Sequence, residues 1–248
     1  MKLSPIQIKA RDGFIDKLRT GEYTQVENPC LCGKKDDVVT ATEDRFGIPI
    51  RTVLCKNCSL MRSDPYYSPE TIHKFYTNDY RTIYGSNLRT KEDFFKEQTG
   101  FGSYIYEDLK RDIFKKDFSG KVIYEIGCGA GGILQYFKTK GNDVYGCDYD
   151  KDFIDYGISQ GLKNLVIGDV DQLSKFGQTD IIIVHHVLEH FLDPITELSK
   201  IRKLLKERQL VRSPGLWQDL EYTLSEARAV MQKHSYDRLP NPDTLSQL

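Results

Sequence analysis

Four cysteines stand close together in the first quarter of the chain. Cys30 and Cys32 form a Cys-x-Cys pair, Cys55 and Cys58 form a Cys-x-x-Cys pair, and 22 residues separate the pairs. Two close pairs of thiolates can complete the tetrahedral shell of a zinc ion, and four such ligands leave no open position for a catalytic water. The spacing therefore predicts a structural zinc site; the alternative is four free cysteines in a loop-rich module.

A second group of residues with chemical potential follows a buried apolar segment in the middle of the chain. The turn Gly127-Cys128-Gly129 opens a glycine-rich stretch that lets a ligand approach the backbone closely. Glu125 precedes this turn, and Asp148 follows 21 residues after Gly127, a spacing that suits an acid binding ribose hydroxyls. Asp169 ends the next apolar segment, where it could accept from an adenine amino group or cap a helix.

Three histidines and an acid stand near one another further on, in the segment HHVLEH. His185, His186, Glu189 and His190 follow the strongly apolar run TDIIIV. An imidazole can take a proton from a nucleophile near neutral pH, because its unperturbed pKa is about 6.5. The alternative is that Glu189 and His190 only cap a turn.

Alternating strands and helices must position these groups. We expect strands in KVIYEIG, DVYGCDYD, LKNLVIGDV and TDIIIV, and helices in ILQYFKTKG, KDFIDYGISQG and ITELSKIRKLLK. Such repeated units predict an α/β fold with a doubly wound, mostly parallel sheet. Ligands of such sheets collect at the carboxyl ends of the strands, where the acids and histidines stand. Between the cysteine pairs, DDVVTAT and IPIRTVL predict the hairpin of a small zinc ribbon.

The segments VIYEIGCGAGG, VYGCDYD, VIGDV and DIIIVHHVLEHFLDP together resemble the class I S-adenosylmethionine-dependent methyltransferases. The resemblance implies S-adenosylmethionine as the cofactor and a Rossmann-like fold. The residues that it places at the cofactor are Glu125, Gly127, Cys128, Gly129, Asp148, Tyr149, Asp169, Val170 and His185. A nicotinamide-dependent enzyme carries a related glycine motif, but the positions of the three acids disfavour it.

The upstream stretch from Pro29 to Tyr80 resembles the zinc-binding module of sugar C-methyltransferases, although its first knuckle is Cys-x-Cys instead of Cys-x-x-Cys. This resemblance implies a sugar acceptor and His190 as the base, with His186 and Glu189 as further catalytic candidates. HVLEH also resembles the E-x-x-E-H segment of quinone-type O-methyltransferases, which implies a divalent metal. His186 replaces the first acid there, so a hard cation would lose an oxygen ligand.

Helices are expected between the cysteine-containing segment and the glycine turn. We expect a helix after Ser68 and Pro69, and a longer one over 91–116 that breaks near Gly100–Gly102 and packs through Tyr104. Tyr76, Tyr80 and Tyr84 either pack this connector or lie over a ligand pocket.

The end of the sequence departs from the methyltransferase pattern after about Glu207. We expect a short strand in QLVRSPGLW, a helix in DLEYTLSEARAVMQKH and no later strand pair. The C-terminal part is thus predicted to be incomplete. Either the chain is a natural short variant, whose exposed sheet edge is covered in an oligomer or by a partner chain, or the gene carries a frame change.

Composition limits the classes of function. The 248 residues carry a net charge of −1, which argues against a partner bound through a basic surface, such as nucleic acid. No apolar run reaches the length of a membrane span, and the start lacks a signal peptide, so we expect a cytoplasmic protein. The expected organisation is a lead-in at 1–25, a zinc module at 26–66, a helical connector at 67–118, a methyltransferase domain at 119–214 and a divergent tail at 215–248.

The leading functional prediction is methyl transfer to a nucleotide-linked sugar or related small molecule, with a histidine base. A catalytically degenerate subunit that binds the cofactor and zinc is the alternative, because the end of the chain appears curtailed.

Overall fold

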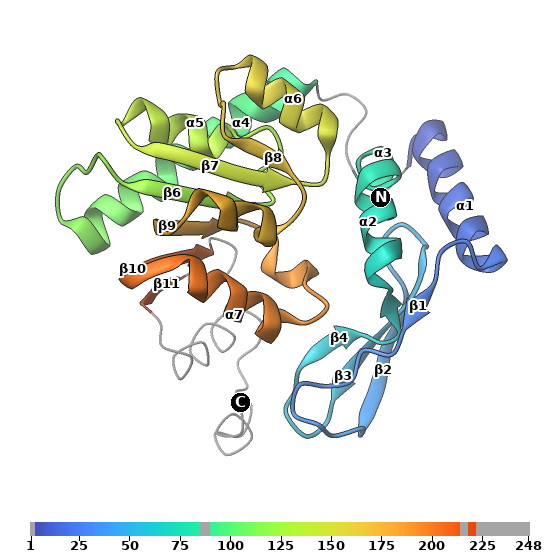
Figure 1. Ribbon diagram of the computed structural model, residues 1–248. Coiled ribbons are helices and arrows are strands. Elements are labelled where there is room, and N and C mark those ends of the chain that lie inside the picture. The colour runs from blue at the N-terminus through green and yellow to red at the C-terminus, as the bar shows by residue number, and fades with distance from the viewer. Residues whose placement is uncertain (1–2, 85–89, 214–217, 222–248) are drawn as a thin grey trace. The chain divides into compact units, whose positions relative to one another are not determined.

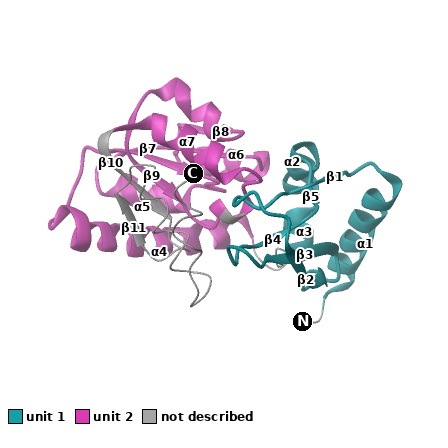
Figure 2. Ribbon diagram, turned by 90° about the horizontal axis from the view of Figure 1, so that it is seen from below, with its two compact units in different colours: residues 1–87, 235–248 teal, residues 88–234 magenta. Residues whose placement is uncertain are grey.

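The chain forms two compact units in the computed structural model, which describes residues 3–84, 90–213 and 218–221 (Figure 1). The first unit contains the described residues up to position 84, and the second contains those from position 90 onward (Figure 2). The expected connector at 67–118 is therefore divided between the two units. Among the described helices, none has both the length and the hydropathy needed to cross a membrane. A cytoplasmic location stays a prediction.

Capping residues determine where the helices of the first unit begin. Helix α1 (Pro5–Thr20) starts after Ser4, whose side chain accepts from the backbone of Gln7, and ends at Gly21 with φ of 79°. Helix α2 (Pro69–Asn78) starts after Ser68, as predicted. Helix α3 (Tyr80–Tyr84) follows, and β1 (Gln25–Val26) pairs antiparallel with β5 (Tyr66–Tyr67).

An aromatic core holds these elements together. Phe14 of α1 lies 5.0 to 5.4 Å, between ring centroids, from Tyr23, Tyr67 and Phe75. The rings of Tyr80 and Tyr84 stack at 5.3 Å and belong to the same cluster, as does the ring of Tyr76. The three candidate tyrosines thus pack within the first unit. Lys17 and Tyr23 also hydrogen-bond the largely buried carboxylate of Asp79, which ties α1 to the end of α2.

A three-stranded antiparallel sheet adjoins the cysteine pairs. It has the order β2 (Asp37–Glu43), β3 (Pro49–Cys55), β4 (Met61–Ser63). Cys55 ends β3, and the other three cysteines lie in the segments before β2 and after β3. The predicted hairpin corresponds to β2 and β3, while β4 was not predicted, because three residues are too few to show an alternating pattern.

The second unit is built on a six-stranded sheet of order β11-β10-β9-β6-β7-β8. Its strands are β6 (Val122–Ile126), β7 (Asp143–Asp148), β8 (Leu165–Ile167), β9 (Thr179–Val184), β10 (Leu205–Ser213) and β11 (Gln218–Glu221). All neighbouring pairs are parallel except β10 with β11. The α/β class and the mostly parallel sheet are confirmed, and the order of the parallel strands is that of a Rossmann-like fold.

Alternate residues of the central strands enter two separate cores. Ile123 of β6 and Ile181 and Ile183 of β9 pack with α4 (Lys91–Leu109), α5 (Gly132–Thr139) and α6 (Lys151–Ser159). Tyr124 and Ile182 pack on the opposite face, with the 3₁₀ helix η2 (Val170–Phe176) and α7 (Pro194–Leu204). Helices thus cover both faces, which explains why the strands read as continuous apolar runs.

Helix α4 is continuous, so the predicted break at Gly100–Gly102 is wrong; the π-helical turn η1 (Lys110–Phe114) follows it. A Cβ atom at Gly102 would lie 2.7 Å from the carbonyl oxygen of Ile133 and 2.8 Å from Cβ of Tyr136. Gly102 therefore permits close contact between α4 and α5 instead of ending the helix. The expectation that Tyr104 packs inward is also wrong, since it is 73% exposed.

The close approach of α4 to α5 predicts opposite effects for two glycines of one helix. We expect G102A to lower the free energy of unfolding, because overpacking typically costs about 1–3 kcal/mol. Nothing lies within 4 Å of a Cβ at Gly100, so G100A should gain the helix propensity of alanine, about 1 kcal/mol. Urea denaturation of both variants measures the difference. Equal stabilisation by the two substitutions would contradict the packing described.

The C-terminal elements differ from the expected ones. Strand β10 begins at Leu205, before the predicted strand, and pairs with β9, which extends the apolar sheet. Residues 218–221 form β11 antiparallel to β10, where the sequence predicted the start of a helix and no later strand pair. The remainder of the predicted helix and tail lies outside the described residues, and a partner chain along a sheet edge stays a prediction.

Candidate functional site

The candidate residues gather where the strand order of the second unit reverses. Strands β7 and β8 extend to one side of β6, whereas β9 and β10 extend to the other. The backbone pairing of Ile126 with Val184 places the ends of β6 and β9 side by side. The glycine turn and the histidine segment leave the sheet from this point, which is where open α/β sheets bind ligands.

The glycine turn takes backbone conformations that other residues adopt with strain. Gly127 and Gly129 have φ of 67° and 54°. A Cβ at Gly127 would meet Cγ2 of Val187 at 2.4 Å, so the histidine segment lies directly against the turn. The side chain of Cys128 is fully buried and fills the space beside Gly146, where a Cβ would lie 2.7 Å from its sulfur. The side chain of Cys128 therefore packs in the core and is not open to a cofactor.

Helix α6 approaches the same turn from the side of β8. A Cβ at Gly157 would lie 2.3 Å from the carbonyl oxygen of Ala130. A residue with a side chain does not fit at this position unless the backbone moves. The turn is therefore held by α6, by β7 and by the histidine segment.

Glu125 is a buried acid beneath the glycine turn. It is 1% exposed, and its Oε2 has no hydrogen-bond partner among the described residues. Burial and the neighbouring charge of Asp148 raise the pKa of Glu125 well above its ordinary value, although a backbone hydrogen bond from Leu134 acts in the opposite direction. An unsatisfied buried carboxyl oxygen is costly, so the site favours a ligand or a proton there.

The raised pKa of Glu125 predicts a pH-dependent stability. The folded state holds this proton above pH ~4.3, where the unfolded chain releases it, so stability should fall by up to about 1.4 kcal/mol per pH unit from there to the folded pKa. E125Q removes the titration and should flatten the profile across that window. Thermal unfolding between pH 4 and 8 measures it, with E97Q on the exposed face of α4 as the control. A wild-type slope in E125Q would contradict the assignment.

Asp148 joins the end of β7 to the glycine turn. Its Oδ2 accepts from the backbone N–H of Gly129 at 2.7 Å, and its Oδ1 accepts from that of Asp150 at 2.9 Å. The carboxylate therefore fixes the glycine turn relative to the end of β7.

The end of β8 lies beside the end of β7. The backbone N–H of Gly168 donates to the carbonyl of Asp148 at 2.9 Å, and burial together with the charge of Asp169 raises the pKa of Tyr149 to about 12. Asp169 caps η2 through the N–H of Asp171, and the side chain of Val170 is buried in the core. The structure thus brings the acids of successive strands to one edge, and the adenine roles of Asp169 and Val170 stay predictions.

The three histidines occupy different environments after β9. The ring of His185 lies 4.5 Å from that of His186, and His186 is exposed with φ of 53°. His190 ends the short helix η3 (Leu188–His190), and its N–H donates to the carbonyl of Val187. Their catalytic and cofactor roles stay predictions, and the side chain of Glu189 lies outside the described residues.

Helix α4 brings two residues to the site that the sequence did not indicate. Oε1 of Gln98 accepts from the N–H of Gly132 at 3.4 Å, at the start of α5. One turn later, the ring of Phe101 lies 5.4 Å from that of His185. The predicted break at Gly100 hid this arrangement, since only an unbroken helix places both side chains together.

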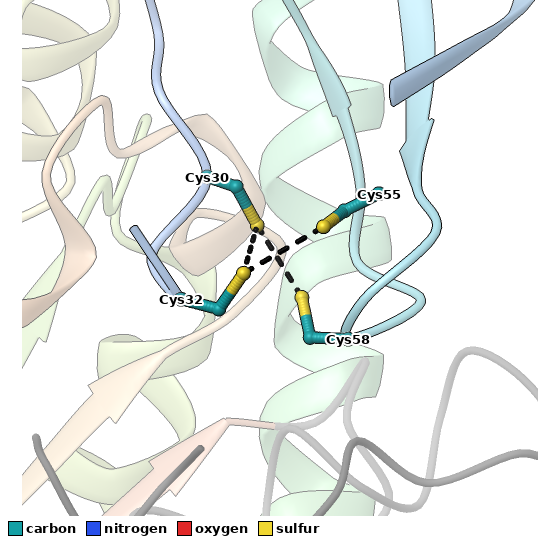
Figure 3. A group of neighbouring side chains, drawn as sticks. All are labelled: Cys30, Cys32, Cys55 and Cys58. Atoms are coloured by element: carbon teal, nitrogen blue, oxygen red, sulfur yellow. Dashed lines mark hydrogen bonds between the residues drawn. The ribbon is translucent and has the colours of Figure 1, made fainter. Parts of the chain in front are cut away.

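The cysteine pairs form one cluster in the first unit (Figure 3). Their four sulfurs lie within 4.8 Å of one another, and Sγ of Cys32 lies 3.4 Å from that of Cys30 and 3.6 Å from that of Cys55. Sulfurs of a tetrahedral zinc site with bonds of ~2.3 Å are ~3.8 Å apart, so the donor set fits this ion. Burial acts against ionisation of Cys32, but hydrogen bonds from the backbone of Lys34 and from neighbouring thiols lower its pKa to about 7.

Comparisons with known proteins agree with this geometry. Residues 124–208 match the sequence family described as the methyltransferase domain. A probable (S)-tetrahydroprotoberberine N-methyltransferase 2 from Papaver bracteatum is 24% identical over 151 residues, which cover 56% of this chain and 42% of the relative. The chain thus spans less than half of that relative.

Two solved structures give further similarities. The plantazolicin methyltransferase BpumL in complex with SAH is 21% identical, with a TM-score of 0.42 over 64% of this chain and 71% of the other. The magnesium protoporphyrin IX methyltransferase from Synechocystis PCC 6803 with bound SAH is 16% identical, with a TM-score of 0.45 over 66% and 87%. Both scores are below 0.5, so these similarities carry no weight for activity.

The matched residues run from β6 to the start of β10, and thus include the glycine turn, the two acids that follow it and the histidine segment. The second unit therefore has a Rossmann-like methyltransferase fold, and its residues 124–208 are similar to the methyltransferase domain family.

Proposed function

We propose that this protein transfers a methyl group from S-adenosylmethionine to a nucleotide-linked sugar or related small molecule, with His190 as the base. The observation that carries the proposal is the unsatisfied Oε2 of Glu125 beneath a glycine turn that Asp148 holds in place. The match of residues 124–208 to the methyltransferase domain supports the same reaction class.

The residues at the turn fit this cofactor. A carboxyl at Glu125 suits a cationic ligand, since its burial leaves an oxygen without a partner. Asp148 would hold the ribose hydroxyls, and Gly127 and Gly129 leave room for the methionine part beside the backbone. Tyr149, Asp169 and Val170 would line the adenine end, and His185 the other.

The cofactor supplies an electrophilic methyl group on its sulfonium. The protein must align the nucleophile with this group, and alignment alone can account for much of the rate. A carbon nucleophile also needs a base, and His190 would take its proton; His186 and Glu189 are further candidates. The histidine segment is held against Gly127 through Val187, so its backbone keeps a fixed position relative to the turn.

We further propose that Cys30, Cys32, Cys55 and Cys58 bind a structural zinc ion. The close approach of the four sulfurs supports this site, and four thiolates leave no position for a substrate. The metal would cross-link the loop before β2 to the turn after β3, at the open end of the β2–β3 hairpin.

One titration and one assay test the methyltransferase proposal. Calorimetry should detect S-adenosylhomocysteine binding by the full chain, and radiolabelled S-adenosylmethionine should label one of a panel of nucleotide-linked sugars, with H190Q at least 100-fold slower. Amines are tested in addition to these sugars, because the relative from Papaver bracteatum is named as a probable N-methyltransferase. Binding without labelling of any acceptor would support the degenerate subunit, and absence of binding would refute both.

A further inference from the structure

Two aromatic side chains of α4 stand exposed beside the candidate site. Phe101 is 41% exposed, although its ring contacts that of His185 at a centroid distance of 5.4 Å. Tyr104 follows three residues later on the same helical face and is 73% exposed. A single exposed aromatic ring is common on protein surfaces. The position of these two rings relative to the candidate site is therefore what indicates a function.

Contacts on both sides fix Phe101 next to the glycine turn. Gln98, one turn before it, accepts from the N–H of Gly132, and Gly102, directly after it, lies against Ile133. His185 belongs to the segment that meets Gly127 through Val187. The exposed face of Phe101 therefore adjoins the carboxyl ends of β6 and β9, where an acceptor must lie to reach the cofactor.

The exposed face of the Phe101 ring is flat and apolar, and its position is fixed. It therefore favours ligands that present a flat ring. Aromatic rings attract other planar rings through stacked and edge-to-face contacts, which a saturated ring reproduces poorly. The imidazoles of His185 and His186 extend the surface and provide polar atoms at its edge.

We propose that the acceptor carries a planar ring and that this ring packs on Phe101, with Tyr104 at the rim. The inference rests on the proposed function, and it narrows the substrate class. The ring has two possible sources: the nucleobase of a nucleotide-linked sugar, or an aromatic ring that is itself part of the methylated group.

Matched pairs of probes test this subsite on the full chain saturated with S-adenosylhomocysteine. Saturation-transfer NMR compares uridine with methyl riboside, and 4-methylphenol with 4-methylcyclohexanol. We expect the planar member of one pair to give at least a fivefold stronger signal, and the pair that responds identifies the source of the ring. Equal signals within both pairs would overturn the proposal.

Substitutions locate the binding to these side chains. F101L, which keeps apolar volume but removes the ring, should reduce the planar signal to that of the saturated probe, whereas F101W should retain it. Y104A, at a position too exposed to support the core, should reduce the signal at least twofold. I158A, which removes an apolar side chain that is 43% exposed on α6, is the control and should leave the signal unchanged.

A calorimetric titration of each variant with S-adenosylhomocysteine distinguishes a failure of the ring subsite from a failure of the proposed function. If the wild-type chain binds this compound but F101L and Y104A both leave the planar signal intact, the subsite is wrong and the proposed function stands. If the wild-type chain does not bind it, both are wrong.

Discussion

D148N is expected to weaken the binding of S-adenosylhomocysteine by about 10- to 100-fold, since hydrogen bonds to a charged acceptor contribute about 1.5–3 kcal/mol. Asp148 accepts backbone N–H groups on both of its oxygens, from Gly129 and from Asp150. An asparagine has one carbonyl oxygen, so its NH₂ group must face one of these donors. The substitution removes the ribose acceptor and loosens the glycine turn together.

Isothermal titration of the full chain at pH 7 measures this loss. D152N is the matched control, because Asp152 carries the same charge on the adjoining helix α6 but is 76% exposed and pairs with Lys91. The control should bind as tightly as the wild type. Wild-type affinity in D148N would remove Asp148 from the site.

Loss of the metal is expected to have the largest effect on the first unit. Structural zinc sites contribute about 10–16 kcal/mol of apparent binding free energy in small domains, so C58S and strong chelators should unfold the sheet that holds the cysteines. The aromatic core around Phe14 is separate from the thiol cluster, so α1 and α2 should retain their helical structure.

Metal analysis by mass spectrometry and thermal unfolding with and without chelator measure this effect. We expect one zinc per chain in the wild type, and a clearly lower first transition in C58S. C147A removes a buried cysteine of the second unit and should keep the full zinc content. If the wild-type protein contains no zinc and its unfolding does not change with chelator, the four cysteines are free thiols.

The sequence predicted the central parallel strands β6 and β9 well because both are buried on both faces of the sheet. The residues of β9, Thr179–Val184, are all buried, so they form an apolar run whose meaning does not depend on distant contacts. The cap Ser68 is likewise a local signal, since its side chain accepts from the backbone N–H of Thr71, three residues later.

The errors concern positions that tertiary contacts decide. A glycine inside a helix reads as a break, but Gly102 is needed for contact with Ile133, which lies 31 residues away in sequence. The same error hid Gln98 and Phe101 as neighbours of the site. Strand β10 begins at Leu205 and takes the last two residues of the predicted helix, because the edge of β9 offers backbone partners that local propensity does not report.

Three interlocked contacts around the glycine turn also determine how a ligand meets it. Gly157 contacts Ala130, Gly146 contacts the sulfur of Cys128, and Gly127 contacts Val187. These contacts form when the chain folds, so the ligand site is formed before a ligand binds. Association then requires little ordering of the backbone, and more of the contact energy appears as affinity. Because of these contacts, none of the three glycines can be replaced by a residue with a side chain without moving its neighbours. Substitution at these positions is therefore restricted by the space available as well as by the contacts that a ligand needs.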